Sequence, residues 1–111
     1  MWKNLQDDLQ LESIIIASEN KPQVIFKHST RCGTSSLAKS RIERNFNETN
    51  IDFYLIDLIK HRNLSNKIAE TFRVYHESPQ VLLIKKGECI YEESHLGINL
   101  DEIIEQAAIN N

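Results

Sequence analysis

Cysteine is scarce in this sequence, since only Cys32 and Cys89 occur among its 111 residues. A secreted domain of this size more often carries several cysteines that form a disulfide framework. Residues 1–8 are polar and acidic, and they lack the basic region and apolar core of a signal peptide. We therefore expect a cytoplasmic protein whose two thiols are free, catalytic or packed in the core.

Long apolar runs and clusters of one charge are also absent. Runs such as Ile14–Ala17 are far too short to cross a bilayer. Acidic and basic residues are interleaved, with a formal net charge of −3 and no basic arm or stripe. The four histidines are scattered and no Cys-x-x-Cys or His-x-x-x-His pair occurs, which is unfavourable for zinc. We expect no membrane, no nucleic acid and no metal among the partners.

The remaining composition is that of one small globular domain spanning residues 1–111. Hydrophobic residues make up 41% and charged residues 26%, the mixture expected of a soluble protein. A chain of this length forms a single modest core, and we expect it to be a monomer.

Hydrophobic periodicity predicts alternating helices and strands. Apolar residues recur at helical spacing within residues 5–16, 37–46, 64–72 and 100–108. Short apolar or β-branched runs predict strands at 23–27, 52–58, 81–85 and 89–92. The order α-β-α-β-α-β-β-α predicts an α/β fold, with a four-stranded mixed sheet flanked by helices. This is the thioredoxin-like arrangement.

Cys32 lies where a predicted strand ends and a helix begins. Unpaired amides and the helix dipole at that place favour a thiolate over a thiol. Arg31 and His28 are close in sequence and predict a positive local field. Gly33 leaves room for a disulfide partner, and Ser35 is placed one helical turn on, where its hydroxyl would donate to the thiolate.

Two structural alternatives stand beside this interpretation. Cys32 would then be one more small residue at a helix start, and Ser35 a helix-capping residue. In either case the hydroxyl of Ser35 cannot resolve a mixed disulfide, so a reaction at Cys32 would use one cysteine only. The polar, electropositive setting favours a reactive Cys32.

Pro79 is the second informative position, because it directly precedes an apolar strand. A trans proline that begins a strand is the ordinary interpretation. In thioredoxin-like proteins this position is instead a cis-proline beside the catalytic sulfur. The backbone of the preceding residue, here Ser78, would then pair with a substrate strand.

Several segments resemble known proteins. Residues 68–75 and 78–80 resemble the thioredoxin segment that leads to its cis-proline. Trp2 and the run Val24–Cys32 resemble the YtxJ family of monothiol bacilliredoxins, and the similarity spans essentially the whole chain. Ser35 matches the serine that ends the family motif, whereas Gly33-Thr34 departs from the Pro-Ile form of some members.

This resemblance implies a substrate class. Such proteins remove bacillithiol, a low-molecular-weight thiol, from protein mixed disulfides. Cys32 would attack the mixed disulfide and keep bacillithiol until a second thiol releases it. Gly33, Thr34, Ser78 and Pro79 would bind substrate, and the partners would be bacillithiolated proteins and a small thiol. Bacillithiol would be a co-substrate, with no further cofactor.

Three alternatives stay open. Cys89, on the predicted fourth strand, is either a resolving cysteine or, as we favour, a small core residue. The Cys-Gly-Thr-Ser motif also resembles the Cys-Gly-Phe-Ser of monothiol glutaredoxins, which bind an iron–sulfur cluster. The third alternative is a non-catalytic module that uses Ser78-Pro79 only to dock peptides.

Overall fold

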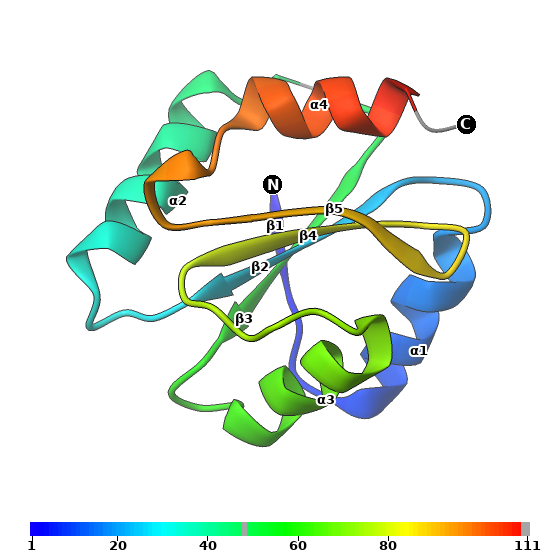
Figure 1. Cartoon of the computed structure of the whole chain (residues 1–111), viewed down its shortest axis with the longest axis horizontal. Coiled ribbons are helices and arrows are strands. Elements are labelled where there is room, and N and C mark those ends of the chain that lie inside the picture. The colour runs from blue at the N-terminus through cyan, green and yellow to red at the C-terminus, as the bar shows by residue number, and fades with distance from the viewer. Residues whose placement is uncertain (48, 110–111) are drawn as a thin grey trace.

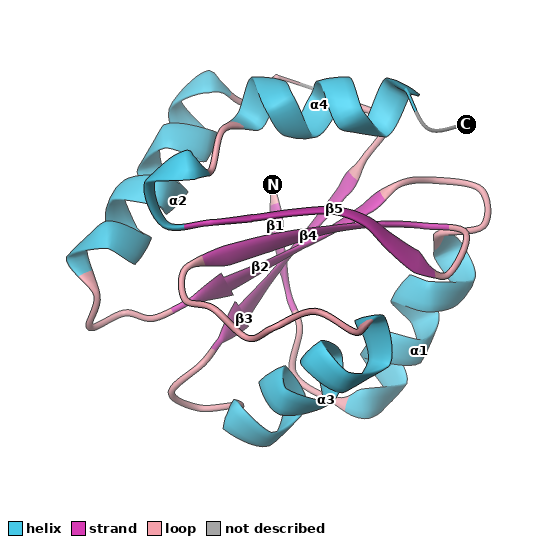
Figure 2. Cartoon of the chain, viewed as in Figure 1, coloured by secondary structure: helices cyan, strands magenta, loops and turns pink. Residues whose placement is uncertain are grey.

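The computed structural model describes residues 1–47 and 49–109, which form one mixed sheet with helices on both faces (Figures 1 and 2). The strands are β1 (Trp2–Asn4), β2 (Gln23–His28), β3 (Asp52–Asp57), β4 (Gln80–Lys85) and β5 (Glu88–Ser94). The helices are α1 (Asp8–Ala17), α2 (Gly33–Asn45), α3 (Arg62–Phe72), the short 3₁₀ helix η1 (His95–Gly97) and α4 (Leu100–Ile109). None of the described helices is long and apolar enough to cross a membrane.

The sheet has the strand order β1-β3-β2-β4-β5. β1, β3 and β2 run parallel, whereas β4 runs antiparallel to β2 and β5 antiparallel to β4. The thioredoxin-like mixed sheet predicted from the sequence is therefore confirmed. The C-terminal end of β2 and the first residue of β4 lie at the same end of the sheet, since Lys27 pairs with Gln80.

The number of strands is five rather than the predicted four. The additional strand, β1, has three residues and lies at the edge of the sheet, paired with β3. A single short segment with one apolar side chain carries no recognisable strand period. It is held instead by tertiary contacts, because the Trp2 ring makes edge-to-face contacts with Phe26 and Phe53.

The first helix is also shorter than its apolar pattern predicts. It begins at Asp8, and the side chain of Asp7 caps it by accepting the Gln10 N–H at 2.9 Å. Leu5 is buried but precedes the helix, and Leu9 is 73% exposed. Before α4, the side chain of Asn99 accepts the N–H of Glu102 at 3.1 Å.

Two separate cores lie on the two faces of the sheet. Alternate residues of β2 point to opposite faces, so Val24 and Phe26 belong to one core and Ile25 to the other. The first core is covered by α2 and α4, and the second by α1 and α3, as Figure 1 shows. Lys27 falls on the α1/α3 side, by the same alternation.

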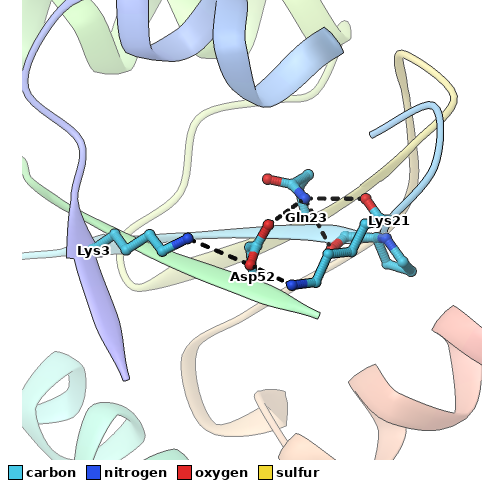
Figure 3. Close-up of polar contacts among 5 residues, drawn as sticks. Lys3, Lys21, Gln23 and Asp52 are labelled. Carbon is cyan, nitrogen blue, oxygen red and sulfur yellow. Dashed lines mark hydrogen bonds and ion pairs between the residues drawn. The ribbon is translucent and has the colours of Figure 1, made fainter. Parts of the chain in front are cut away.

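A polar cluster around Asp52 lies at the end of the sheet remote from Cys32, where β2 and β3 begin (Figure 3). The Asp52 carboxylate accepts a hydrogen bond from Nε2 of Gln23 at 2.8 Å and forms ion pairs with Nζ of Lys21 at 2.9 Å and Nζ of Lys3 at 3.5 Å. Burial by itself raises the pKa of Asp52, but these partners outweigh it and the pKa lies below its usual value. The cluster ties β1 and the start of β2 to β3.

Candidate functional site

Cys32 occupies the N-cap position of α2, directly after the turn that leaves β2. Its backbone is extended (φ −111°, ψ 117°), and its side chain is partly exposed. The backbone N–H donates to the carbonyl of Ser29 at 3.1 Å, and the carbonyl accepts the N–H of Ser36 at 3.1 Å. The turn therefore places the sulfur at the start of α2, and hydrogen bonds hold the backbone of Cys32 on both sides.

The field at this helix start suits an anionic sulfur. The first turn of α2 contains no acidic residue, and the N-terminal end of a 13-residue helix carries partial positive charge. Arg31 is exposed beside Cys32. Within the described first turn, the Cys32 side chain makes no capping hydrogen bond.

Ser35 makes contacts that differ from those expected. Its hydroxyl lies 2.6 Å from Nδ1 of His28 and accepts the N–H of Ser29 at 3.1 Å. Its side chain is fully buried. Ser35 therefore binds back onto the end of β2, and a stabilising effect of Ser35 on Cys32 stays a prediction.

His28 is a buried residue at the end of β2. It is 7% exposed and packs edge-to-face against Phe26. Burial lowers the pKa of His28, and the charge of Lys39 lowers it further. Asp57 and Glu43 act in the opposite direction without reversing the shift. The lowered pKa disfavours the charged ring, which argues against the predicted positive contribution from His28.

Pro79 lies beside this turn, because the β2–β4 register that pairs Gln80 with Lys27 brings Pro79 level with His28. The Ser78–Pro79 peptide bond is cis, and Pro79 is buried while Ser78 is partly exposed. The carbonyl of Pro79 accepts the N–H of His95 at 3.0 Å. Three segments therefore meet at this end of the sheet: the loop before β4, the start of η1 and the turn after β2.

Gly33 and Thr34 directly follow Cys32 at the start of α2, and Gly33 is exposed. Apart from its chain neighbours and the backbone of its own helix, a Cβ atom added at Gly33 would have no atom within 4 Å, so no other element crowds Gly33. Thr34 is partly buried. Gly33, Thr34, Ser78 and Pro79 are thus placed around the turn of Cys32, although their role in binding substrate stays a prediction.

Cys89 lies at the opposite end of the sheet. It pairs with Ile84, which in turn pairs with Gln23 at the beginning of β2, whereas Cys32 follows the end of β2. Burial raises the pKa of Cys89 to about 11, against the opposing effect of backbone hydrogen bonds. Its sulfur donates to the carbonyl of Tyr91 at 3.3 Å. Cys89 is therefore a packed residue and is not placed to resolve a disulfide at Cys32.

The sequence-based interpretation missed the pair Lys27–His76. Lys27 is fully buried, and its Nζ lies 3.2 Å from Nδ1 of His76 in the loop that leads to Pro79. The sequence shows a lysine next to an apolar run, but the burial of all six residues of β2 is seen only in the structure.

The chain matches the family model described as Monothiol bacilliredoxin BrxC over residues 3–103. The chain belongs to the monothiol bacilliredoxin family. This confirms the family that the motif around Cys32 indicates.

Solved structures agree with this assignment. A candidate oxidoreductase with a thioredoxin fold is 30% identical, with a TM-score of 0.83 over 95% of this chain and 92% of that chain. Thioredoxin from Fasciola hepatica is 17% identical, with a TM-score of 0.76 over 98% of this chain and 99% of that one. Thioredoxin from Malassezia sympodialis is 15% identical, with a TM-score of 0.76 over 97% and 91%. The two thioredoxins show the fold alone, whereas the family membership supports a thiol redox role for this bacilliredoxin.

Proposed function

We propose that the chain is a monothiol oxidoreductase that removes bacillithiol from protein mixed disulfides through Cys32. The observation that carries the proposal is the position of Cys32, a partly exposed thiol at the N-cap of α2 in a chain of the bacilliredoxin family. A helix start is where proteins favour a thiolate, which is the nucleophile of thiol–disulfide exchange. We also propose that the reaction takes place in the cytosol, where thiols are kept reduced.

The reaction has two exchange steps. The Cys32 thiolate attacks the bacillithiol sulfur of the mixed disulfide, so a Cys32–bacillithiol disulfide forms and the bond to the target protein breaks. The target leaves as a thiolate with the electron pair of that bond and then takes a proton from solvent. A second small thiol attacks the bacillithiol sulfur in the same way, which regenerates the Cys32 thiolate and releases a disulfide of two small thiols.

The enzyme depends on that external thiol. Ser35 stands where a dithiol enzyme would carry its second cysteine, and Cys89 lies at the other end of the sheet. We therefore expect the Cys32–bacillithiol adduct to accumulate whenever no reducing thiol is supplied.

A single-turnover assay tests the proposal. A target protein carrying one bacillithiol mixed disulfide is mixed with the reduced enzyme, and both proteins are followed by intact mass and peptide mapping. One bacillithiol should move to Cys32 while the target thiol is freed. The Cys32→Ser variant should transfer none, and Cys89→Ala should react as the wild type does.

A comparison of two mixed disulfides separates the bacilliredoxin, glutaredoxin and peptide-docking alternatives. The same target carrying glutathione should react more slowly than the bacillithiol form. Equal or faster transfer from the glutathione form, together with a stable chromophore after anaerobic iron–sulfur reconstitution, would favour a glutaredoxin role. If neither form transfers its small thiol to Cys32, the non-catalytic peptide-docking module is the alternative that remains.

A further inference from the structure

A chain of hydrogen bonds behind Cys32 links the end of β2 to the first turn of α2. Nδ1 of His28 lies 2.6 Å from Oγ of Ser35, and the same oxygen accepts the N–H of Ser29 at 3.1 Å. The carbonyl of Ser29 accepts the N–H of Cys32 at 3.1 Å. Ser29 is thus held at both ends, by the Ser35 side chain on one side and by the Cys32 backbone on the other.

The number of protons at Oγ of Ser35 limits what this hydroxyl can do. A hydroxyl has one proton to donate and two lone pairs that accept. One lone pair takes the N–H of Ser29. If Nδ1 of His28 is unprotonated, the hydroxyl proton is donated to it and none is left for the sulfur of Cys32. If Nδ1 is protonated, it fills the second lone pair and the hydroxyl proton is free.

The geometry favours the first arrangement. Among the described residues, Oγ of Ser35 has two hydrogen-bond partners, Nδ1 of His28 and the N–H of Ser29. If Nδ1 carried a proton, both partners would donate, and the proton of this buried hydroxyl would have no acceptor. Both side chains are buried, so neither is free to exchange this partner for water.

We propose that His28 and Ser35 are positioning residues that fix the turn carrying Cys32, with the Ser35 hydroxyl donating to Nδ1 of His28 and holding the N–H of Ser29. Ser35 then acts on Cys32 through the geometry of the turn and not by donating to the sulfur. The inference rests on the proposed role of Cys32 as the nucleophile.

Alkylation of Cys32 by iodoacetamide tests the inference without any bacillithiol. The rate is measured from pH 5 to pH 9 in a Cys89→Ala background, so that one thiol reacts. His28→Leu and Ser35→Ala should each slow alkylation at pH 7 by about tenfold, as expected when a buried hydrogen bond is lost. The double variant should be no slower than either single variant, because the two residues act as one unit.

Two further variants serve as controls. His28→Asn should restore most of the rate, because the Asn side-chain oxygen can accept the Ser35 hydroxyl near the position of Nδ1. Ser65→Ala removes the hydroxyl of another fully buried serine, on α3. It should leave the alkylation rate unchanged even where it lowers the melting temperature.

Direct donation from Ser35 to the sulfur predicts a different pattern. His28→Leu would then free the hydroxyl proton for Cys32, and its rate would equal or exceed that of the wild type. That result would overturn the inference. Nitrogen-15 NMR of wild-type His28 gives a test that needs no variant: Nδ1 should be unprotonated at pH 7, and a protonated Nδ1 would overturn it.

These outcomes are separable from those of the proposed function. If the alkylation pattern is as expected but no bacillithiol transfer occurs, the positioning role stands and only the substrate assignment fails.

Discussion

The ammonium of Lys27 lies 3.2 Å from Nδ1 of His76, and its side chain is fully buried in the sheet face covered by α1 and α3. Oγ of Ser65 lies 3.4 Å from the same nitrogen. Burial lowers the pKa of Lys27 to about 8, and burial followed by the charge of Lys27 lowers the pKa of His76. A buried cation whose described hydrogen-bond partner is a neutral ring is costly for the fold.

Lys27→Met should therefore raise the free energy of unfolding at pH 7, by on the order of 1–3 kcal/mol. In the folded protein the pKa of Lys27 lies near 8 instead of 10.5. The unfolded chain thus binds more protons between these values, and Lys27 destabilises the fold fully below about pH 8. The penalty fades as the pH rises toward 10.5, so the stability difference between variant and wild type should shrink there.

Urea unfolding at pH 7, 8, 9 and 10 measures this difference. Lys67→Met, at a half-exposed surface position paired with Asp8, is the matched control and should show no such convergence. A Lys27→Met protein that is less stable than wild type at every pH would contradict the prediction and indicate that the Lys27–His76 contact is net favourable.

The two cysteines should differ sharply in reactivity. With its pKa raised to about 11 by burial, Cys89 is a thiolate in only about one molecule in a thousand at pH 8. Alkylation of Cys89 in the native protein should be roughly two orders of magnitude slower than in the urea-unfolded chain. Peptide mapping after timed labelling provides the two rates, and similar rates in both states would show that Cys89 is open to solvent.

The edge strand β1 should contribute measurably to stability. Trp2 contacts Phe26 and Phe53, and its indole N–H donates to Glu43 at 2.7 Å. Because the ring is partly buried, Trp2→Ala should lower the free energy of unfolding by about 2 kcal/mol, measured by urea denaturation followed by circular dichroism.

Glu43→Gln is the control for the charge of this contact. The amide oxygen can still accept the indole N–H, so the loss should stay below about 0.5 kcal/mol. A Trp2→Ala protein as stable as wild type would show that β1 is not part of the cooperative fold.

Much of the fold could be predicted because its signals are local. The helical spacing of Ala38 and Ile42 and the apolar run Val81–Ile84 lie within single elements, and each is buried as its pattern indicates. β1 could not be predicted in this way, because Trp2 gains its partners from β2 and β3 across the sheet. The start of α1 was misplaced for a similar reason, since Leu5 packs in the core without being helical.

For the candidate site too, some features could be predicted from the sequence and others could not. Cys32 at a strand-to-helix junction follows from residue order, and so does the absence of a second cysteine at Ser35. The hydrogen-bond partner of Ser35 does not follow from residue order, since the hydroxyl could face the sulfur or the end of β2. His28 and Lys27 are polar residues within an otherwise apolar run, and the sequence offers no measure of how deeply each is buried.

The sequence by itself determined the kind of protein, because the order of helices and strands and the single cysteine at a helix start depend on local patterns. Only the tertiary structure decided how that cysteine is surrounded. The alternation of β2 directs His28 toward Ser35 and Lys27 toward His76. The register of β4 sets Pro79 level with His28 and leaves Cys89 at the far end. Charge and proton position at these groups are set by burial and by partners distant in sequence, and these exist only once the sheet has formed.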